Sequence, residues 1–184
     1  KKPIIFLFIS GPHFNLPHKN LNDFVESMLS LKELGLDFSI KITVSYEELS
    51  NSGLWNDNLN ELTNFLGYLD DSQEILNLYS ENSILISTSV IETLGLHVID
   101  AVMNGILCIV PDENYSKYVY GDDIPKYKLC DSENLTFEIL KLTSFNNNDC
   151  QSIIKKSQRY ISESANKKQS SIISIINNVL NHED

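Results

Sequence analysis

The chain has 184 residues, a formal net charge of -11 and an isoelectric point near 4.7. This length suffices for one domain with a sizeable core, and a hydrophobic content of 42% is ordinary for a globular protein. The acidic balance excludes a broad nucleic-acid surface or an anionic membrane face, because both reward clustered Lys and Arg. Binding of one diphosphate stays compatible with this charge, since it needs only one or two cations.

Apolar runs of strand length recur along the chain and alternate with helical patterns. Six runs predict buried or half-buried strands, at 3–10, 37–44, 62–66, 84–86, 106–110 and 127–130. Apolar residues at helical spacing predict helices at 20–34, 71–79, 95–103, 112–120, 131–142 and 149–181, with a weak helical pattern at 46–60. Asn20 or Asn22 is expected to cap the first helix, and Asn146-Asn147-Asn148 to separate the last two.

The alternation of strands and helices indicates an α/β fold. We expect a Rossmann-like, doubly wound parallel sheet of about six strands, with helices on both faces and a long C-terminal helical segment. The last helical pattern has a polar middle at 162–171, so it could bend or form two helices. No internal boundary divides the chain, and 1–184 is expected to be a single domain.

Cysteine usage and segment type bear on location. Three cysteines without paired spacing fit a reducing compartment better than a disulfide framework. The sequence has no signal peptide and no long apolar span, so we expect a cytoplasmic protein without a transmembrane segment. Its start at Lys1 without Met suggests a fragment of a longer protein.

The stretch 79–111 carries the strongest functional signal. It reads strand, loop, helix, turn, strand, which is one βαβ unit. Glu92 and Gly95 lie at the loop-to-helix junction, and Asp100 follows Glu92 after seven intervening residues. Ligands of open α/β sheets bind beyond the carboxyl ends of the strands, where a helix N-terminus suits phosphate.

These residues resemble the nucleotide-sugar motif of retaining glycosyltransferases of the GT-B fold, of the family four or group 1 type. The family motif is written around E-x-F-G-L…E-A-M-x-x-G-x-P-V-I, and the matching residues here are Glu92-Thr93-Leu94-Gly95-Leu96, Asp100-Ala101, Met103 and Gly105. Weaker likeness extends back through Leu78-Tyr79, Phe65-Leu66-Gly67 and Lys19-Asn20. The resemblance implies that 1–184 is the C-terminal, donor-binding domain of a two-domain enzyme, with the acceptor domain absent.

The resemblance also implies roles for single residues. Glu92 would bind hydroxyls of the donor sugar and Lys19 the diphosphate, so these two are the catalytic candidates. Asp100 would bind the ribose hydroxyls, which a carboxylate can accept in pairs, although Asp is one methylene shorter than the usual Glu. The donor-binding candidates are Gly11, His13, His18, Gly67, Thr93, Leu94, Gly95, Leu96 and Asp100.

Simpler interpretations stay open for the charged candidates. Glu92 could be a solvated loop acid, Lys19 a solvated lysine near a helix start, and Asp100 a first-turn acid favoured by the helix dipole. The family usually places an Arg several residues before the Lys. Here no Arg lies between Gly11 and Lys19, and His13 and His18 are the only substitutes. A neutral His lacks the permanent charge and the fork of a guanidinium.

The resemblance implies a transferase without a cofactor, in which a nucleotide-diphosphate sugar is the donor substrate. No cluster of His, Cys and Asp has metal-ligand spacing, which agrees with the metal independence of the family. The hexosyl group would pass with retention to an acceptor glycan or lipid-linked saccharide on the absent domain, in surface polysaccharide or glycan biosynthesis. That domain could also attach the enzyme peripherally to the inner membrane face. The fragment alone would bind the donor but transfer little.

Two other functions remain open. The chain could be a non-catalytic nucleotide-binding or structural GT-B-like module, because the arginine is missing. It could also be an enzyme similar to a sugar-nucleotide epimerase. The chain has no G-x-G-x-x-G fingerprint and no P-loop motif, so the motifs support neither of those phosphate sites.

Overall fold

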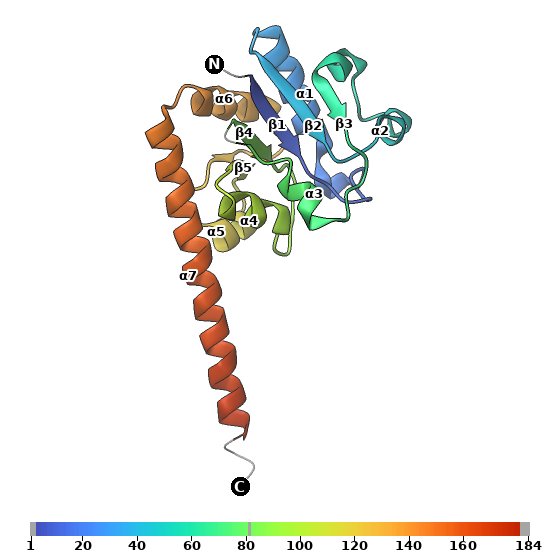
Figure 1. Cartoon of the computed structure of the whole chain (residues 1–184). Coiled ribbons are helices and arrows are strands. Elements are labelled where there is room, and N and C mark those ends of the chain that lie inside the picture. Colours follow the sequence, from blue (N-terminus) through green and yellow to red (C-terminus); the bar gives the residue numbers. More distant parts are fainter. Residues whose placement is uncertain (1–2, 81, 181–184) are drawn as a thin grey trace.

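A computed structural model describes residues 3–80 and 82–180, with side chains up to residue 167 (Figure 1). In this part of the chain, six strands form one sheet in the order β3-β2-β1-β4-β5-β6, and every neighbouring pair is parallel. The strands are β1 (Ile4–Phe8), β2 (Phe38–Ile42), β3 (Thr63–Phe65), β4 (Ser83–Ile86), β5 (Leu107–Pro111) and β6 (Lys126–Tyr127). The predicted doubly wound α/β fold is confirmed.

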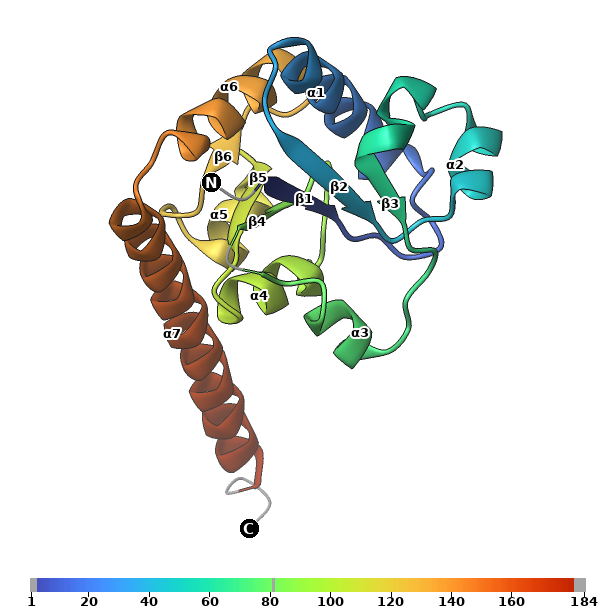
Figure 2. The same ribbon diagram turned by 45° about the horizontal axis from the view of Figure 1, so that its top comes forward.

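Helices cover both faces of the sheet, because alternate strand residues point to opposite sides. Phe6 and Phe8 of β1 pack with α1 (Leu21–Glu33) and α6 (Ser132–Thr143) in one core cluster. Leu7 packs in a second cluster with α4 (Leu96–Met103) and α5 (Asn114–Tyr120). Figure 2 shows α1 and α6 on one side of the sheet and α4 on the other. The prediction of helices on both faces is therefore confirmed.

Short helical pieces connect β2 to β4. The weak pattern at 46–60 becomes α2 (Tyr46–Ser52) and the 3-10 helix η2 (Asp57–Leu62), and Gly53 ends α2 with a φ of 68°. Ser45 caps α2 by accepting from the backbone N–H of Glu48. Asp71 caps α3 (Ser72–Leu76) by accepting from the backbone N–H of Gln73.

Several predicted boundaries are wrong. β6 spans Lys126–Tyr127 rather than 127–130, because Asp131 and Cys130, which has a φ of 57°, already belong to the turn into α6. Asn20 stands at the start of α1, but its side chain donates to Asp23 and caps no N–H group. Asn146 begins the last helix by accepting from two backbone N–H groups, so the predicted break is a cap.

The last helix, α7 (Asn147–Leu180), is one continuous helix, so the alternative of two helices is wrong. Its first half is anchored by buried Ile154 and Ile161, and by Gln158, whose Nε2 donates to the carbonyl of Val102 at 2.9 Å. Figure 1 shows α7 passing α5 and α4 and continuing away from the sheet. The polar middle of α7 needs no break, because it lies where the helix leaves the core.

Candidate functional site

The site lies where the sheet changes its direction of winding. The chain proceeds from β1 through β2 to β3 on one side and through β4 to β6 on the other, so β1 and β4 are neighbours. Crevices at such a switch point, beyond the carboxyl ends of the strands, are the usual ligand sites of open α/β sheets. The loops that follow β1 and β4 meet at these carboxyl ends.

Three hydrogen bonds join these two loops. The backbone N–H of Val90 donates to the carbonyl of His18 at 2.7 Å, and the hydroxyl of Thr88 donates to the carbonyl of Lys19 at 2.7 Å. The ammonium of Lys19 then reaches across to the carboxylate of Glu92, with 2.6 Å between Nζ and Oε1. The catalytic candidates from two distant parts of the sequence therefore form one ion pair.

An open hollow of about 360 Å³ lies beside this ion pair, and it contains most of the predicted motif. Its lining residues are Lys19, Glu92, Thr93, Leu94, Gly95, Leu96 and His97. Lys19 is therefore not a fully solvated lysine, since its side chain is 23% exposed, and Glu92 is 16% exposed. The interpretation of Glu92 as a solvated loop acid is wrong.

Gly95 shapes the floor of the hollow. It has a φ of 54° and precedes the first residue of α4, so the first N–H groups of that helix open toward the site. A Cβ atom at position 95 would lie 1.9 Å from the hydroxyl oxygen of Tyr120, a buried side chain whose hydroxyl has no hydrogen-bond partner among the residues that the structure describes. The position therefore requires glycine for both backbone and steric reasons.

Two side chains in the hollow, Glu92 and His97, have shifted pKa values. Burial raises the pKa of Glu92, but hydrogen bonds from Lys19 and Ser89 and the charge of Lys19 outweigh it, so the net pKa is lowered. Burial lowers the pKa of His97 to about 4, although the charge of Glu92 opposes this shift. At neutral pH the site therefore holds a carboxylate, an ammonium and a neutral imidazole, whose Nε2 lies 3.4 Å from the Ser87 hydroxyl.

The structure places the other predicted residues outside the hollow. Asp100 is exposed on the second turn of α4, so its interpretation as a first-turn acid is wrong. Its charge contributes, after burial, to the raised pKa of Tyr79. The remaining four are the exposed Gly11 and His13, half-buried His18, which contributes its backbone carbonyl to the loop contact, and Gly67, which follows β3 with a φ of 70°.

Sequence reasoning missed four side chains around Glu92. They are Ser89, His97, Tyr115 and Tyr120. The two tyrosines lie on α5, outside the motif. Tyr115 contacts Ser89, and Tyr120 lies beside Gly95. No spacing in the sequence signals such contacts, since they depend on how α5 packs against the loop after β4.

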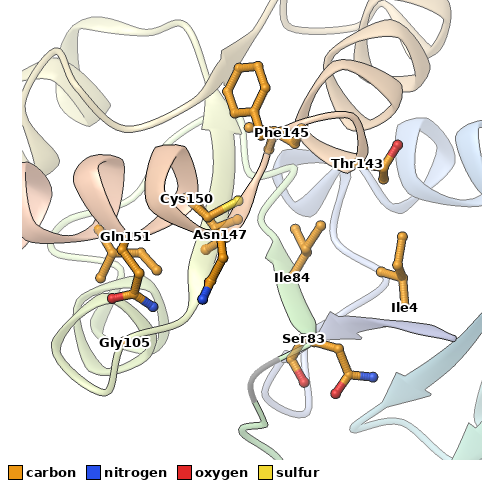
Figure 3. A pocket seen from close by; sticks show the side chains of 13 residues that line it. Ile4, Ser83, Ile84, Gly105, Thr143, Phe145, Asn147, Cys150 and Gln151 are labelled. Atoms are coloured by element: carbon orange, nitrogen blue, oxygen red, sulfur yellow. The ribbon is translucent and has the colours of Figure 1, made fainter. Parts of the chain in front are cut away.

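A second cavity of about 400 Å³ lies at the opposite, amino-terminal ends of the strands (Figure 3). Side chains from the first turn of α7, including Asn147 and Cys150, face Ile4 and Ile84 near the starts of β1 and β4. None of its described lining residues is charged. The hollow beside Lys19, which contains a cation, is therefore the better candidate for a diphosphate site.

The described residues bring no three His, Cys, Asp or Glu side chains together as a metal site. No helix in the described ranges combines the length and apolar character needed to cross a bilayer.

Solved structures with a similar fold are glycosyltransferases. A glycosyltransferase from Rickettsia africae has a TM-score of 0.78 and 18% identity, over 100% of this chain and 49% of that one. The C-terminal domain of a group 1 family glycosyl transferase from Francisella tularensis has a TM-score of 0.63 and 17% identity, over 88% and 86% of the two chains. The chain has the fold of a glycosyltransferase domain. No protein-family model and no curated protein matches it.

A third similar structure is the catalytic domain of cholesterol-alpha-glucosyltransferase from Helicobacter pylori. Its TM-score is 0.69 at 13% identity, over 88% of this chain and 99% of that one. The chain spans about half the length of the Rickettsia protein and 46% of a sucrose-phosphate synthase from Thermosynechococcus elongatus. Identities this low establish the fold alone.

Proposed function

We propose that the chain is the C-terminal, donor-binding part of a two-domain GT-B glycosyltransferase that binds a nucleotide-diphosphate sugar. The observation that carries the proposal is the Lys19–Glu92 ion pair beside the N-terminus of α4, at the switch point of the sheet. A cation and a helix N-terminus suit a diphosphate, and a carboxylate next to them suits sugar hydroxyls. Similarity to a separate C-terminal glycosyl transferase domain supports the domain assignment.

In this function the ion pair exchanges partners when the donor binds. Lys19 turns from Glu92 to the diphosphate, and the released carboxylate accepts hydrogen bonds from the sugar. The lowered pKa of Glu92 keeps it ionised for that role. Asp100, one turn further along α4, is the candidate for the ribose hydroxyls. The protein would act by positioning the donor and by stabilising the departing diphosphate, with retention at the anomeric carbon.

The acceptor, a glycan or lipid-linked saccharide, would approach from a second domain. The catalytic centre would then lie between the two domains, as part of surface polysaccharide or glycan biosynthesis. Location in the cytoplasm, with peripheral attachment to the inner membrane face through that domain, belongs to the same proposal.

One observation favours a second candidate, a non-catalytic nucleotide-binding module. Lys19 is the only cation among the residues described around the hollow, and Glu92 already neutralises it. His13 and His18, the candidates for replacing the family's arginine, do not line the hollow. The stabilisation of a leaving diphosphate would then be weaker than with an Arg–Lys pair.

Calorimetric titration of the chain tests the proposal. The ligands are UDP, GDP and ADP, the matching monophosphates, and one hexose conjugate of each diphosphate. We expect one base to give measurable binding, and Lys19→Ala to weaken the diphosphate more than the monophosphate, by roughly 5- to 100-fold for a lost charged contact. Absence of binding by every nucleotide would contradict the proposal. Binding without sugar transfer by the longer protein would instead support the non-catalytic candidate.

A further inference from the structure

We propose that Tyr115 is a positioning residue, whose hydroxyl holds the loop after β4 at Ser89 and thereby fixes where Glu92 meets the donor sugar. The inference rests on the proposed function, because it assigns to Tyr115 the placement of that carboxylate. Tyr115 lies on α5, outside the motif that contains Glu92, and does not line the hollow itself.

The first step is a direct contact between α5 and the loop. The Tyr115 hydroxyl donates to the backbone carbonyl of Ser89 at 2.5 Å, across 26 residues of sequence. A loop carbonyl would otherwise be free to turn toward water. A short hydrogen bond from a half-buried ring restricts the backbone three residues before Glu92.

The second step leads from Ser89 to the charged pair. Ser89 is 4% exposed, and its side chain lies close enough to Glu92 to help lower the pKa of that carboxylate. Glu92 in turn accepts from Lys19. Contacts therefore lead from α5 through Ser89 to Glu92.

The third step concerns the residues on either side of Ser89 in the sequence. Thr88 and Val90 donate to the carbonyls of Lys19 and His18. The loop is thus held both by the segment after β1 and by Tyr115. Loss of the Tyr115 hydroxyl would leave only the contacts with the segment after β1.

The ring of Tyr115 is itself well placed to act as an anchor. It meets Tyr120 edge-on, with 6.4 Å between the ring centroids and 82° between the planes. The hydroxyl of Tyr120 in turn occupies the space beside Gly95 where a Cβ atom would lie. The start of α5 is held by the Ser116 hydroxyl, which donates to the carbonyl of Pro111 at 2.5 Å. Burial, and then the charges of Glu92 and Glu113, raise the pKa of Tyr115, so its hydroxyl keeps its proton at neutral pH.

The test uses Tyr115→Phe, which keeps the ring and removes the hydroxyl. Wild type and variant are titrated with the nucleoside diphosphate that binds and with its hexose conjugate. We expect the variant to bind the diphosphate as wild type does, while its affinity for the conjugate falls about five- to tenfold. Ser89→Ala removes the next contact in the chain and should give the same selective loss. Tyr46→Phe, whose hydroxyl contacts Asp57 and neither loop of the site, should change neither affinity.

A double-mutant cycle with Glu92→Gln separates positioning from general stability. If Tyr115 acts through Glu92, adding Tyr115→Phe to Glu92→Gln weakens the conjugate no further. Equal loss of both ligands in Tyr115→Phe, or additive losses in the cycle, would overturn the inference while the proposed function stands. Failure of wild type to bind any nucleotide would overturn both.

Discussion

Lys19, Glu92 and His97 influence one another's charge at the centre of the candidate site. The Lys19–Glu92 pair satisfies two partly buried charges in the absence of ligand. A donor diphosphate would therefore compete with Glu92 for Lys19, and the net gain is the difference between two ion pairs rather than the full strength of one. Such an exchange links phosphate binding to the release of the carboxylate that would hold the sugar.

His97 gives this cluster a measurable pH signature. Its pKa is about 4 in the folded protein, against about 6.5 for an unperturbed histidine. Between these values the unfolded state binds a proton that the folded state does not, so the free energy of unfolding falls as the pH drops. From pH 7 to pH 4.5, wild type should lose about 2–3 kcal/mol more than His97→Gln. Urea unfolding at steps across this range measures the difference.

The matched control for this experiment is His13→Gln, which removes an exposed histidine of the loop after β1. Comparison with it separates the effect of His97 from that of replacing any histidine by Gln. The lowered pKa of Glu92 places the loss of its contribution at more acidic pH, below about 4.3 for an unfolded Glu. Parallel curves for wild type and His97→Gln would show that the imidazole is protonated equally in both states.

At the scale of single elements, the start of α4 decides the shape of the hollow. Gly95→Ala should lower the free energy of unfolding by about 2–5 kcal/mol, from a left-handed backbone and from the clash with the Tyr120 hydroxyl. Gly95→Ala combined with Tyr120→Phe should recover most of the steric part, because only the ring carbon Cζ at 3.2 Å remains close, and leave about 1–2 kcal/mol of backbone strain. Chemical denaturation of the wild type, the two single variants and the double variant gives the coupling.

Gly105→Ala is the control for Gly95→Ala. Gly105 also has a positive φ, of 80°, but a Cβ there would meet no atom within 4 Å. It should cost the backbone term alone, about 1–2 kcal/mol. Equal losses at positions 95 and 105 would mean that Tyr120 yields without cost and does not constrain the start of α4.

Elements with continuous apolar runs were predictable from the sequence, because burial on both faces leaves a direct signal. The run at 106–110 corresponds to β5 (Leu107–Pro111), and the predicted helix at 95–103 corresponds to α4 (Leu96–Met103). The predicted bounds of β6 are wrong because only two of its residues pair with β5, and the turn that leads to the helix cap Asp131 follows directly. The prediction of a break at Asn146-Asn147-Asn148 is wrong, since Asn146 caps α7 and the other two asparagines belong to it.

The candidate site was predictable only where sequence spacing reflects local structure. Glu92 and Gly95 lie close together in the sequence, in one loop and at the start of the helix that follows it. Lys19 is a candidate only through the resemblance to the family. The bond from Tyr115 to Ser89 is different, because its acceptor is a backbone carbonyl, which every residue has. The proximity of α5 to this loop follows from tertiary packing, and no residue pattern reports it.

At the scale of the whole molecule, the ion-paired Lys19 and the N-terminus of α4 lie in a strongly acidic chain. The formal net charge of -11 repels a nucleotide at long range, whereas Lys19 and the N-terminus of α4 attract its phosphates at contact. The two effects respond differently to salt, since screening acts most on separated charges, with a Debye length of about 8 Å at physiological ionic strength.

We therefore expect the association rate constant of a nucleoside diphosphate to rise severalfold with salt, unlike that of a basic phosphate-binding surface. Stopped-flow mixing with a fluorescent diphosphate at ionic strengths between roughly 10 and 300 mM measures the rate, where the Debye length falls from about 30 Å to below 8 Å. The uncharged nucleoside should show no trend. Lys19→Met should give a steeper rise, because it removes one positive charge and leaves the repulsion. A rate that falls with salt would mean that the positive potential at the hollow extends beyond the surface and outweighs the acidic body.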